Sequence, residues 1–267
     1  KFLTEVKAGI TPLTIWTYQE VGHNQTAKQE LKELFPNTRD VFDTPKPVSL
    51  IERIIDIATD KESIVLDFFG GSATTAHAVI SKNQKDSGNR KFILIQINEE
   101  TGKDSFKYIS DFSIDRIKRS IEKTSSSMGV RVLKVDTSNM TDIYYRPDQA
   151  NQADMFAQVQ NIKEDRTDED LLFQVLLDWG VGLTLPISKQ QISSKDVFFV
   201  NADDAGESAD LIACFASDIS NELIKTIAEK QPLRVVFRDD GFATDAVKIN
   251  VEQIFKQISP ITDVKSI

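Results

Sequence analysis

Residues 67–75, with the sequence DFFGGSATT, bring together the residue types that bind a small charged ligand. The two adjacent glycines let the backbone approach a ligand closely and adopt positive φ. The hydroxyls of Ser72, Thr74 and Thr75, with the free N–H groups at the start of a helix, suit a carboxylate or another anion. Asp67 suits a cationic or hydroxyl-bearing group. These residues are therefore the first candidates for a binding site in this chain.

The elements on either side place this stretch at the end of a strand. The apolar run at residues 63–67 predicts a buried parallel strand, and a helix is expected from near Thr74 to about Ser81. A polar loop at 82–90 and a second buried strand at 91–97 complete a unit of the length of a parallel βαβ crossover. Open α/β sheets bind ligands outside the carboxyl ends of their strands, which is where the turn would lie.

The second strand also ends in polar residues, among them Gln96 and Glu99. An acid at this position is the usual contact for a ribose diol, which leaves a dinucleotide-dependent oxidoreductase as an alternative. Its G-x-G-x-x-G pattern is absent, because only the adjacent pair Gly70 and Gly71 is present. No Gly-Lys-Ser/Thr follows the glycines, which argues against a phosphate-binding loop. A tight turn with capping hydroxyls and no ligand is the remaining alternative.

Other helices in the first half are expected from apolar spacing. They lie at 26–34, where Thr26 is the expected cap, at 48–58, and at 106–123. Two prolines in three positions make 42–47, with the sequence FDTPKP, an extended turn. Residues 1–26 hold one strand at most.

A flexible break at 125–129, or the strand RVLKV directly after it, is the candidate domain boundary. We therefore predict domains at 1–130 and 131–267. The second domain repeats the alternation of helices and strands more loosely. Its helices are expected at 168–179, 218–230 and 248–258, and its strands at 183–187, 196–200, 210–215 and 233–238. Both domains are predicted to be α/β.

Composition excludes several classes of protein. The chain has 267 residues, of which 40% are hydrophobic and 27% charged, as in ordinary globular proteins. A single cysteine, Cys214, excludes a disulfide framework and a cysteine-rich zinc site, and two histidines make a histidine metal centre a poor hypothesis. The acidic groups at 164–170 and 203–210 lack the EF-hand pattern. We expect no metal, no membrane span and no signal peptide, and therefore a cytoplasmic protein.

Charge is distributed unevenly along the chain. Residues 1–137 carry 20 Lys and Arg against 19 Asp and Glu, whereas residues 138–267 carry 12 against 22. The first half can approach a phosphate backbone at no net electrostatic cost, but the second half would be repelled by one. This asymmetry suggests two units with different roles.

The stretch IVLDFFGGSATTAHAV resembles the S-adenosylmethionine-binding motif of the β-class amino-methyltransferases that modify DNA. The family form reads roughly Asp-x-Phe-x-Gly-Ser-Gly-Thr-Thr, so Ala73 stands where glycine is usual. The chain resembles in particular the modification (Mod) subunits of type III restriction–modification systems, which are adenine-N6 DNA methyltransferases. Further stretches carry this resemblance, at 14–35, 42–55, 91–100, 168–187 and 232–255.

This resemblance implies a partial Rossmann-like methyltransferase sheet that binds S-adenosylmethionine, followed by a smaller α/β C-terminal domain. It places Asp67 near the cofactor's ammonium and Gln96 and Glu99 near its ribose and adenine. Pro45, Lys46 and Pro47 would close the pocket from the other side. The rest of the turn would line the methionine end of the cofactor. The contacts would be Phe68, Gly70, Ser72, Thr74 and Thr75, and Phe69 and Gly71 lie between them in the same cofactor-binding turn.

The family transfers the methyl group with an Asp/Asn-Pro-Pro-Tyr/Phe tetrapeptide, whose aromatic residue stacks on the flipped base. None of the eight prolines is adjacent to another, so we expect no catalytic residue in this chain. In this class the tetrapeptide precedes the cofactor motif, and the chain begins with Lys1. The sequence is therefore interpreted as the C-terminal portion of a Mod subunit that is inactive alone.

The expected partners follow from the same resemblance. DNA would be bound mainly by the region before Lys1, and the acidic second half would serve a homodimer and the restriction helicase/nuclease subunit. Tyr144, Tyr145 and Arg146 are candidate contacts to DNA or to a partner. The alternative function is a non-catalytic module for dimerisation or for binding the restriction subunit.

Overall fold

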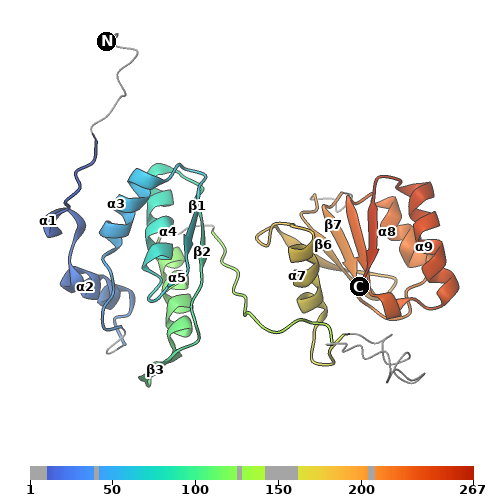
Figure 1. Ribbon diagram of the computed structural model, residues 1–267, viewed down its shortest axis with the longest axis horizontal. Coiled ribbons are helices and arrows are strands. Elements are labelled where there is room, and N and C mark those ends of the chain that lie inside the picture. The colour runs from blue at the N-terminus through green and yellow to red at the C-terminus, as the bar shows by residue number, and fades with distance from the viewer. Residues whose placement is uncertain (1–10, 39–41, 125–127, 142–161, 204–207) are drawn as a thin grey trace, which may run out of the picture. The chain divides into compact units, whose positions relative to one another are not determined.

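The computed structural model describes residues 11–38, 42–124, 128–141, 162–203 and 208–267. The chain divides into two units, Lys1–Leu133 and Lys134–Ile267, which are coloured blue to green and yellow to red in Figure 1. Each unit combines helices with strands, so the predicted α/β class is confirmed. No helix among the described residues is long and apolar enough to span a membrane.

The first unit begins with the helices α1, α2 and α3. These helices span Tyr18–Val21, Asn24–Leu34 and Val48–Ala58. The third has the predicted bounds, but α2 begins two residues earlier than predicted. Its N-cap is His23, whose Nδ1 accepts the Thr26 backbone N–H at 3.2 Å, so the prediction that Thr26 caps the helix is wrong. No strand is present in residues 11–26.

A parallel strand pair and its crossover helix follow. Strand β1 (Ile64–Asp67) pairs with β2 (Lys91–Leu94), and helix α4 (Thr74–Asp86) connects them. The predicted βαβ unit is therefore confirmed, although α4 extends five residues beyond its predicted end. The extension includes Asn83, a buried side chain that donates to the backbone carbonyl of Arg90 and accepts from its N–H. These bonds hold the last turn of α4 against the start of β2.

The two strands are partly buried on one face and exposed on the other, so the prediction of fully buried strands is wrong. Val65, Phe92 and Leu94 pack against α3, α4 and the later helix α5 (Ile109–Thr124), which lie on one side of the strands in Figure 1. The opposite face remains exposed, because the described residues place no helix over it. We call it the bare face; it comprises Ile64, Leu66, Phe68, Ile93, Ile95 and Ile97.

A short hairpin precedes the last helix of this unit. Strands β3 (Glu100–Lys103) and β4 (Phe106–Tyr108) pair antiparallel, and α5 (Ile109–Thr124) follows directly. The hairpin takes the residues that were predicted to begin the helix. Residues 131–135 form no strand, contrary to prediction, and Val135 is 95% exposed.

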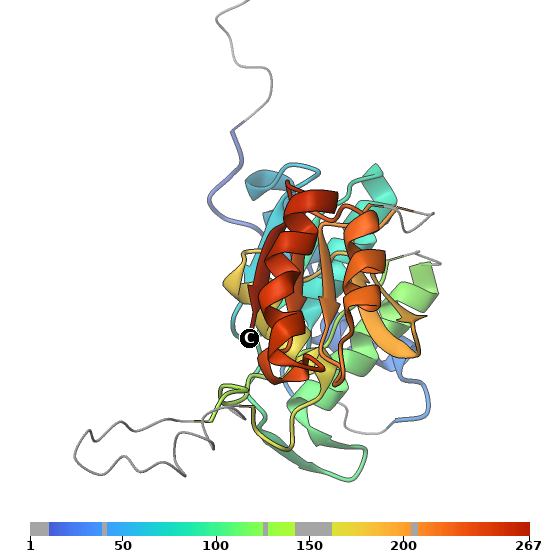
Figure 2. The same cartoon turned by 90° about the vertical axis from the view of Figure 1, so that its right-hand side faces the viewer.

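The second unit is a five-stranded mixed sheet in the order β5-β6-β7-β8-β9. Its strands span Ile187–Ile192, Lys195–Val200, Leu211–Cys214, Arg234–Phe237 and Asp263–Ser266. Strand β6 pairs antiparallel with both β5 and β7, whereas β7, β8 and β9 are parallel to one another. Helices α8 (Asn221–Glu229) and α9 (Asp245–Ile258) are the crossovers of the parallel part and lie side by side in Figure 2.

Helices cover both faces of this second sheet. Helices α8 and α9 bury one face in a cluster centred on Val235, Phe237 and Phe255. Helix α7 (Asp168–Asp178), which ends one residue before its predicted end, buries the other face against Phe198 and Leu211. The sheet itself differs from the prediction at β5, which lies four residues later than expected, and at β9, which was not predicted.

Candidate functional site

The turn between β1 and α4 is held against the end of β2 by backbone and side-chain hydrogen bonds. The Gly70 N–H donates to the Ile95 carbonyl at 3.0 Å, and the Gly71 N–H donates to Gln96 Oε1 at 2.7 Å. A Cβ on Gly70 would lie 3.4 Å from the Ile95 carbonyl oxygen, so glycine permits this close approach. Gly71 adopts φ +48°. The structure therefore brings Gln96 to the turn.

Asp67 organises the turn from the end of β1. Its Oδ2 accepts the Thr75 hydroxyl at 2.6 Å, and its Oδ1 accepts the Phe69 backbone N–H at 3.0 Å. The carboxylate thus links the strand, the turn and the first turn of α4. Each carboxylate oxygen can accept more than one hydrogen bond, so a further donor can still bind there.

Ser72 and Thr74 are buried, and their hydroxyls contact a residue that the sequence reasoning missed. Nη1 of Arg116, on α5, donates to the Ser72 carbonyl at 2.9 Å and to the hydroxyls of Ser72 and Thr74 at 3.0 Å each. Their predicted role as direct ligand contacts stays a prediction, since both hydroxyls face the guanidinium. Between them, Ala73 adopts the left-handed conformation with φ 57° and ψ 33°, which costs an L-residue about 1–2 kcal/mol.

Arg116 is fully buried, which is unusual for a cation. Desolvation lowers its pKa to about 10, and the charge of Glu30 partly offsets this effect. Its Nε has no hydrogen-bond partner among the described residues. A signal for it exists in the sequence: Phe112, Arg116 and Ser120 recur every four residues and share the buried face of α5. A cation on an apolar helix face indicates a specific partner.

The Pro-Lys-Pro segment lies beside the turn, and its closing of a cofactor pocket stays a prediction. The Lys46 carbonyl accepts the Thr74 hydroxyl at 3.4 Å. Pro45 and Pro47 are buried, and Pro47 is the N-cap of α3. The Lys46 side chain is exposed.

Three predicted residues remain at the exposed margin of the site. Phe68 and Phe69 are 61% and 83% exposed, with ring centroids 5.2 Å apart. Glu99 is also exposed, and its backbone N–H donates to the Ile97 carbonyl. The structure therefore gathers Asp67, the glycines and Gln96 at one place, while Phe68, Phe69 and Glu99 stand at its edge.

His77, one turn into α4, lies next to Arg116. Its Nδ1 is 3.4 Å from Arg116 Nη2, and burial together with that charge lowers the pKa of the imidazole to about 3. His77 is therefore neutral in the folded protein at neutral pH, which leaves it without the proton that a general acid would supply.

Acidification should destabilise the first unit through His77. In the unfolded chain its pKa is about 6.5, so between pH 6.5 and 3 the unfolded state binds more protons and stability falls as pH falls. We expect a loss of roughly 1–2 kcal/mol from pH 7.5 to pH 5. Urea unfolding of a Trp179→Phe protein, followed by the fluorescence of Trp16, measures it. An unchanged pH dependence in His77→Gln would refute this origin.

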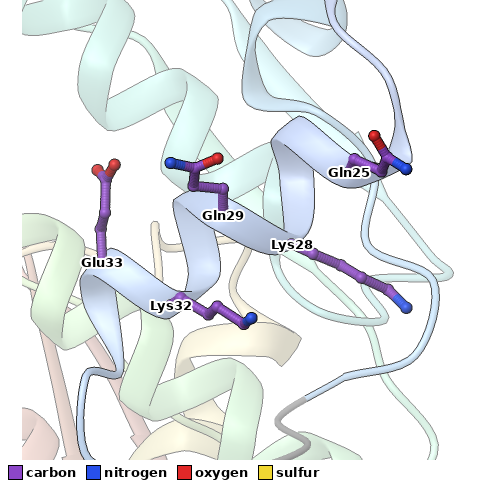
Figure 3. A pocket seen from close by; sticks show the side chains of 5 residues that line it. All are labelled: Gln25, Lys28, Gln29, Lys32 and Glu33. Carbon is purple, nitrogen blue, oxygen red and sulfur yellow. The ribbon is translucent and has the colours of Figure 1, made fainter.

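A surface hollow lies elsewhere, on the outer side of α2 (Figure 3). It is lined by Gln25, Lys28, Gln29, Lys32 and Glu33, which all belong to that helix. All five side chains are polar, and no residue of the β1–α4 turn lines this hollow. Among the described ranges of the chain, no group of three or more His, Cys, Asp or Glu could hold a metal ion. Tyr144, Tyr145 and Arg146 lie outside the described residues.

Comparison with known proteins finds similarities that include most of the first unit. Residues 4–108 match the family described as DNA methylase. The chain is 39% identical over 127 residues to the Mod subunit of the type III enzyme StyLTI from Salmonella typhimurium, and 43% identical over 122 residues to that of EcoPI from Escherichia phage P1. It is 36% identical over 110 residues to the type II methyltransferase M.KpnI from Klebsiella pneumoniae.

These matches are partial on both sides. They cover 43%, 43% and 39% of this chain, and 19%, 18% and 26% of the respective relatives. The family match includes the Pro-Lys-Pro segment, the β1–α4 turn and β2. Residues 4–108 are therefore similar to the DNA methylase family, and the chain is similar to Mod subunits over less than half of its length.

Proposed function

We propose that this chain supplies the S-adenosylmethionine-binding part of a DNA adenine-N6 methyltransferase, as in the modification subunit of a type III restriction–modification system. The observation that carries the proposal is the β1–α4 turn, where Asp67, Gly71 and Gln96 converge within a DNA methylase segment. In this proposal β1, α4 and β2 are part of a Rossmann-like sheet, and the second unit is a separate α/β domain.

The residues of the turn fit the polar groups of this cofactor. The Asp67 carboxylate can accept the cofactor's ammonium in addition to its present donors. The N-terminal end of α4 carries positive partial charge, which suits the cofactor's carboxylate. Gln96 and Glu99 follow the carboxyl end of the neighbouring strand β2, where ribose hydroxyls are usually bound. S-adenosylmethionine would supply an activated methyl group, and these residues would bind and orient it.

The transfer step itself is assigned to groups that this sequence does not contain. No two of its prolines are adjacent, so it has no Asp-Pro-Pro-Tyr tetrapeptide. We therefore propose that the chain alone binds the cofactor without transferring the methyl group, and that methylation of DNA requires the rest of a longer subunit.

Calorimetric titration with S-adenosylmethionine tests the cofactor assignment. We expect saturable heat at submillimolar cofactor and none with NAD at the same concentration. NAD is the matched control, because the oxidoreductase alternative makes the opposite prediction. Absence of heat at millimolar S-adenosylmethionine, in a chain whose circular dichroism shows it to be folded, would contradict the proposal.

The alternative function, a module for homodimer or restriction-subunit contacts, is favoured by one observation on the second half. Residues 138–267 carry 12 basic against 22 acidic side chains. This net negative charge repels the phosphates of DNA, so a protein is the more suitable partner for this half. The two functions are compatible, since they concern different units. Light scattering of the chain at high concentration tests the dimer, and a strictly monomeric result would count against it.

A further inference from the structure

We propose that Arg116 is a positioning residue, whose guanidinium clamps Ser72 and Thr74 on both sides of Ala73 and so holds the β1–α4 turn in its binding conformation. The clamp itself follows from the geometry of the turn. Its consequence for cofactor affinity rests on the proposed function.

The turn needs such support because of Ala73. This residue is left-handed, a conformation that glycine adopts freely and alanine does not. Its methyl group is fully buried and packs with Ala76, Ile80 and Ile117. A strained backbone of this kind persists only where its surroundings hold it. Without an external constraint, the turn would relax toward a conformation that alanine prefers.

Arg116 supplies that constraint from a different element. Its Nη1 reaches the carbonyl and hydroxyl of Ser72 and the hydroxyl of Thr74, at 2.9–3.0 Å. The three acceptors flank Ala73, so rotation of its backbone would break the bonds. Because the guanidinium is fully buried, water cannot replace them.

The same environment argues against a purely stabilising role. Burying a guanidinium is unfavourable, and Arg116 has an unpaired Nε and no carboxylate in an ion pair with it among the described residues. An apolar side chain of similar length would fill the space at less cost. The arginine is therefore best explained by the geometry that it imposes on residues 72–74.

A second buried arginine provides the matched control. Arg90 is 4% exposed; its guanidinium binds Asn83 and Asp86 at the opposite end of α4 and Thr59 at the end of α3. It belongs to the same unit and contacts the same helix, but it does not touch the turn. Arg90→Met thus removes a buried cation without removing the clamp.

Amide hydrogen exchange of the full 267-residue chain tests the clamp without any ligand. The Gly71, Ala73 and His77 amides donate to Gln96, Gly70 and Ala73, so their protection reports the turn. We expect Arg116→Met to speed exchange in residues 70–77 about ten-fold, relative to residues 64–67. Arg116→Lys, which keeps a donor, should produce a smaller increase and covers the case in which the methionine variant does not fold.

Combining Arg116→Met with Ala73→Gly tests whether the effect of the arginine depends on the strained alanine. If Arg116 holds a strained alanine, the exchange increase caused by Arg116→Met should shrink at least three-fold in an Ala73→Gly background. The proposal is overturned by unchanged exchange in both Arg116 variants, by an equal increase in Arg90→Met, or by additive effects of the two substitutions.

Calorimetry on the same proteins separates this inference from the proposed function. Arg116→Met should weaken S-adenosylmethionine binding about ten-fold, while Arg90→Met should leave it within two-fold. If the wild-type chain binds no S-adenosylmethionine, the proposed function is contradicted. The amide exchange rates then still show whether Arg116 holds the turn. Equal affinity in wild type and Arg116→Met, with normal exchange, overturns the clamp and leaves the proposed function intact.

Discussion

Replacing Asp67 with alanine should weaken S-adenosylmethionine binding about 100-fold, the largest single effect that we expect at the turn. The substitution removes the acceptors of the Thr75 hydroxyl and the Phe69 N–H, which link β1 to α4. It also removes the charge that is proposed to bind the cofactor's ammonium. Calorimetric titration of the folded variant measures the change.

Two milder variants separate these two causes. Asp67→Asn keeps the shape of the side chain and can still form hydrogen bonds with the Phe69 N–H and Thr75. It should therefore lose only the attraction between the carboxylate and the ammonium, and weaken cofactor binding about ten-fold. Thr75→Val removes one bond and no charge, and we expect a change of about three-fold or less. If Asp67→Asn binds as tightly as wild type, the carboxylate contributes only to the turn and does not contact the ammonium.

Phe237→Ala should lower the free energy of unfolding of the second unit by about 3–5 kcal/mol. Phe237 is fully buried at the end of β8, between β7 and β9, and its ring packs near Phe242 and Phe255 with centroids 5.6 and 6.3 Å away. Truncation would leave a cavity that the parallel strands on either side cannot close. Urea unfolding of a Trp16→Phe protein, followed through Trp179, measures the loss.

An exposed position on the neighbouring helix is the control for this experiment. Ile249 lies on α9 and is 74% exposed, so Ile249→Ala should change the unfolding free energy by less than about 0.5 kcal/mol. Comparable losses in the two variants would show that the described core does not carry the stability of this unit.

Helices and the central parallel strands could be predicted because their patterns repeat over several turns or form short apolar runs. Helix α3 has its predicted bounds, and α7 ends one residue short of them. The strand pair β1 and β2 was expected from two apolar runs at the length of a crossover. Local periodicity determines these elements, so little tertiary information is needed to find them.

Elements that depend on distant contacts were missed or misplaced. Strand β9, with the sequence DVKS, has no apolar run and forms because it pairs with β8. Strand β5 is polar along most of its length and is connected to the following strand β6 by a turn at Ser193 and Ser194, both with positive φ. Serine is an uncommon residue in that conformation, so the turn carries no familiar sequence signal.

The candidate site shows the same division. Asp67, Gly70 and Gly71 follow directly from the spacing of one motif, and the neighbouring strand places Gln96 beside them. Arg116 could not be located in this way, because it reaches the turn from α5, more than 40 positions later in the chain. Only the tertiary structure shows that its guanidinium binds Ser72 and Thr74.

The bare face of β1 and β2 has a consequence for how this chain tolerates substitution. Side chains that are already half exposed lose little buried area when they are shortened, so Leu66, Ile93 and Ile95 should behave as surface positions in a mutational scan for folding. Hydrophobicity alone would rank the same residues among the core. A scan of folding and a scan of the proposed cofactor binding, compared position by position, would therefore show whether substitutions on this face act through stability or through function.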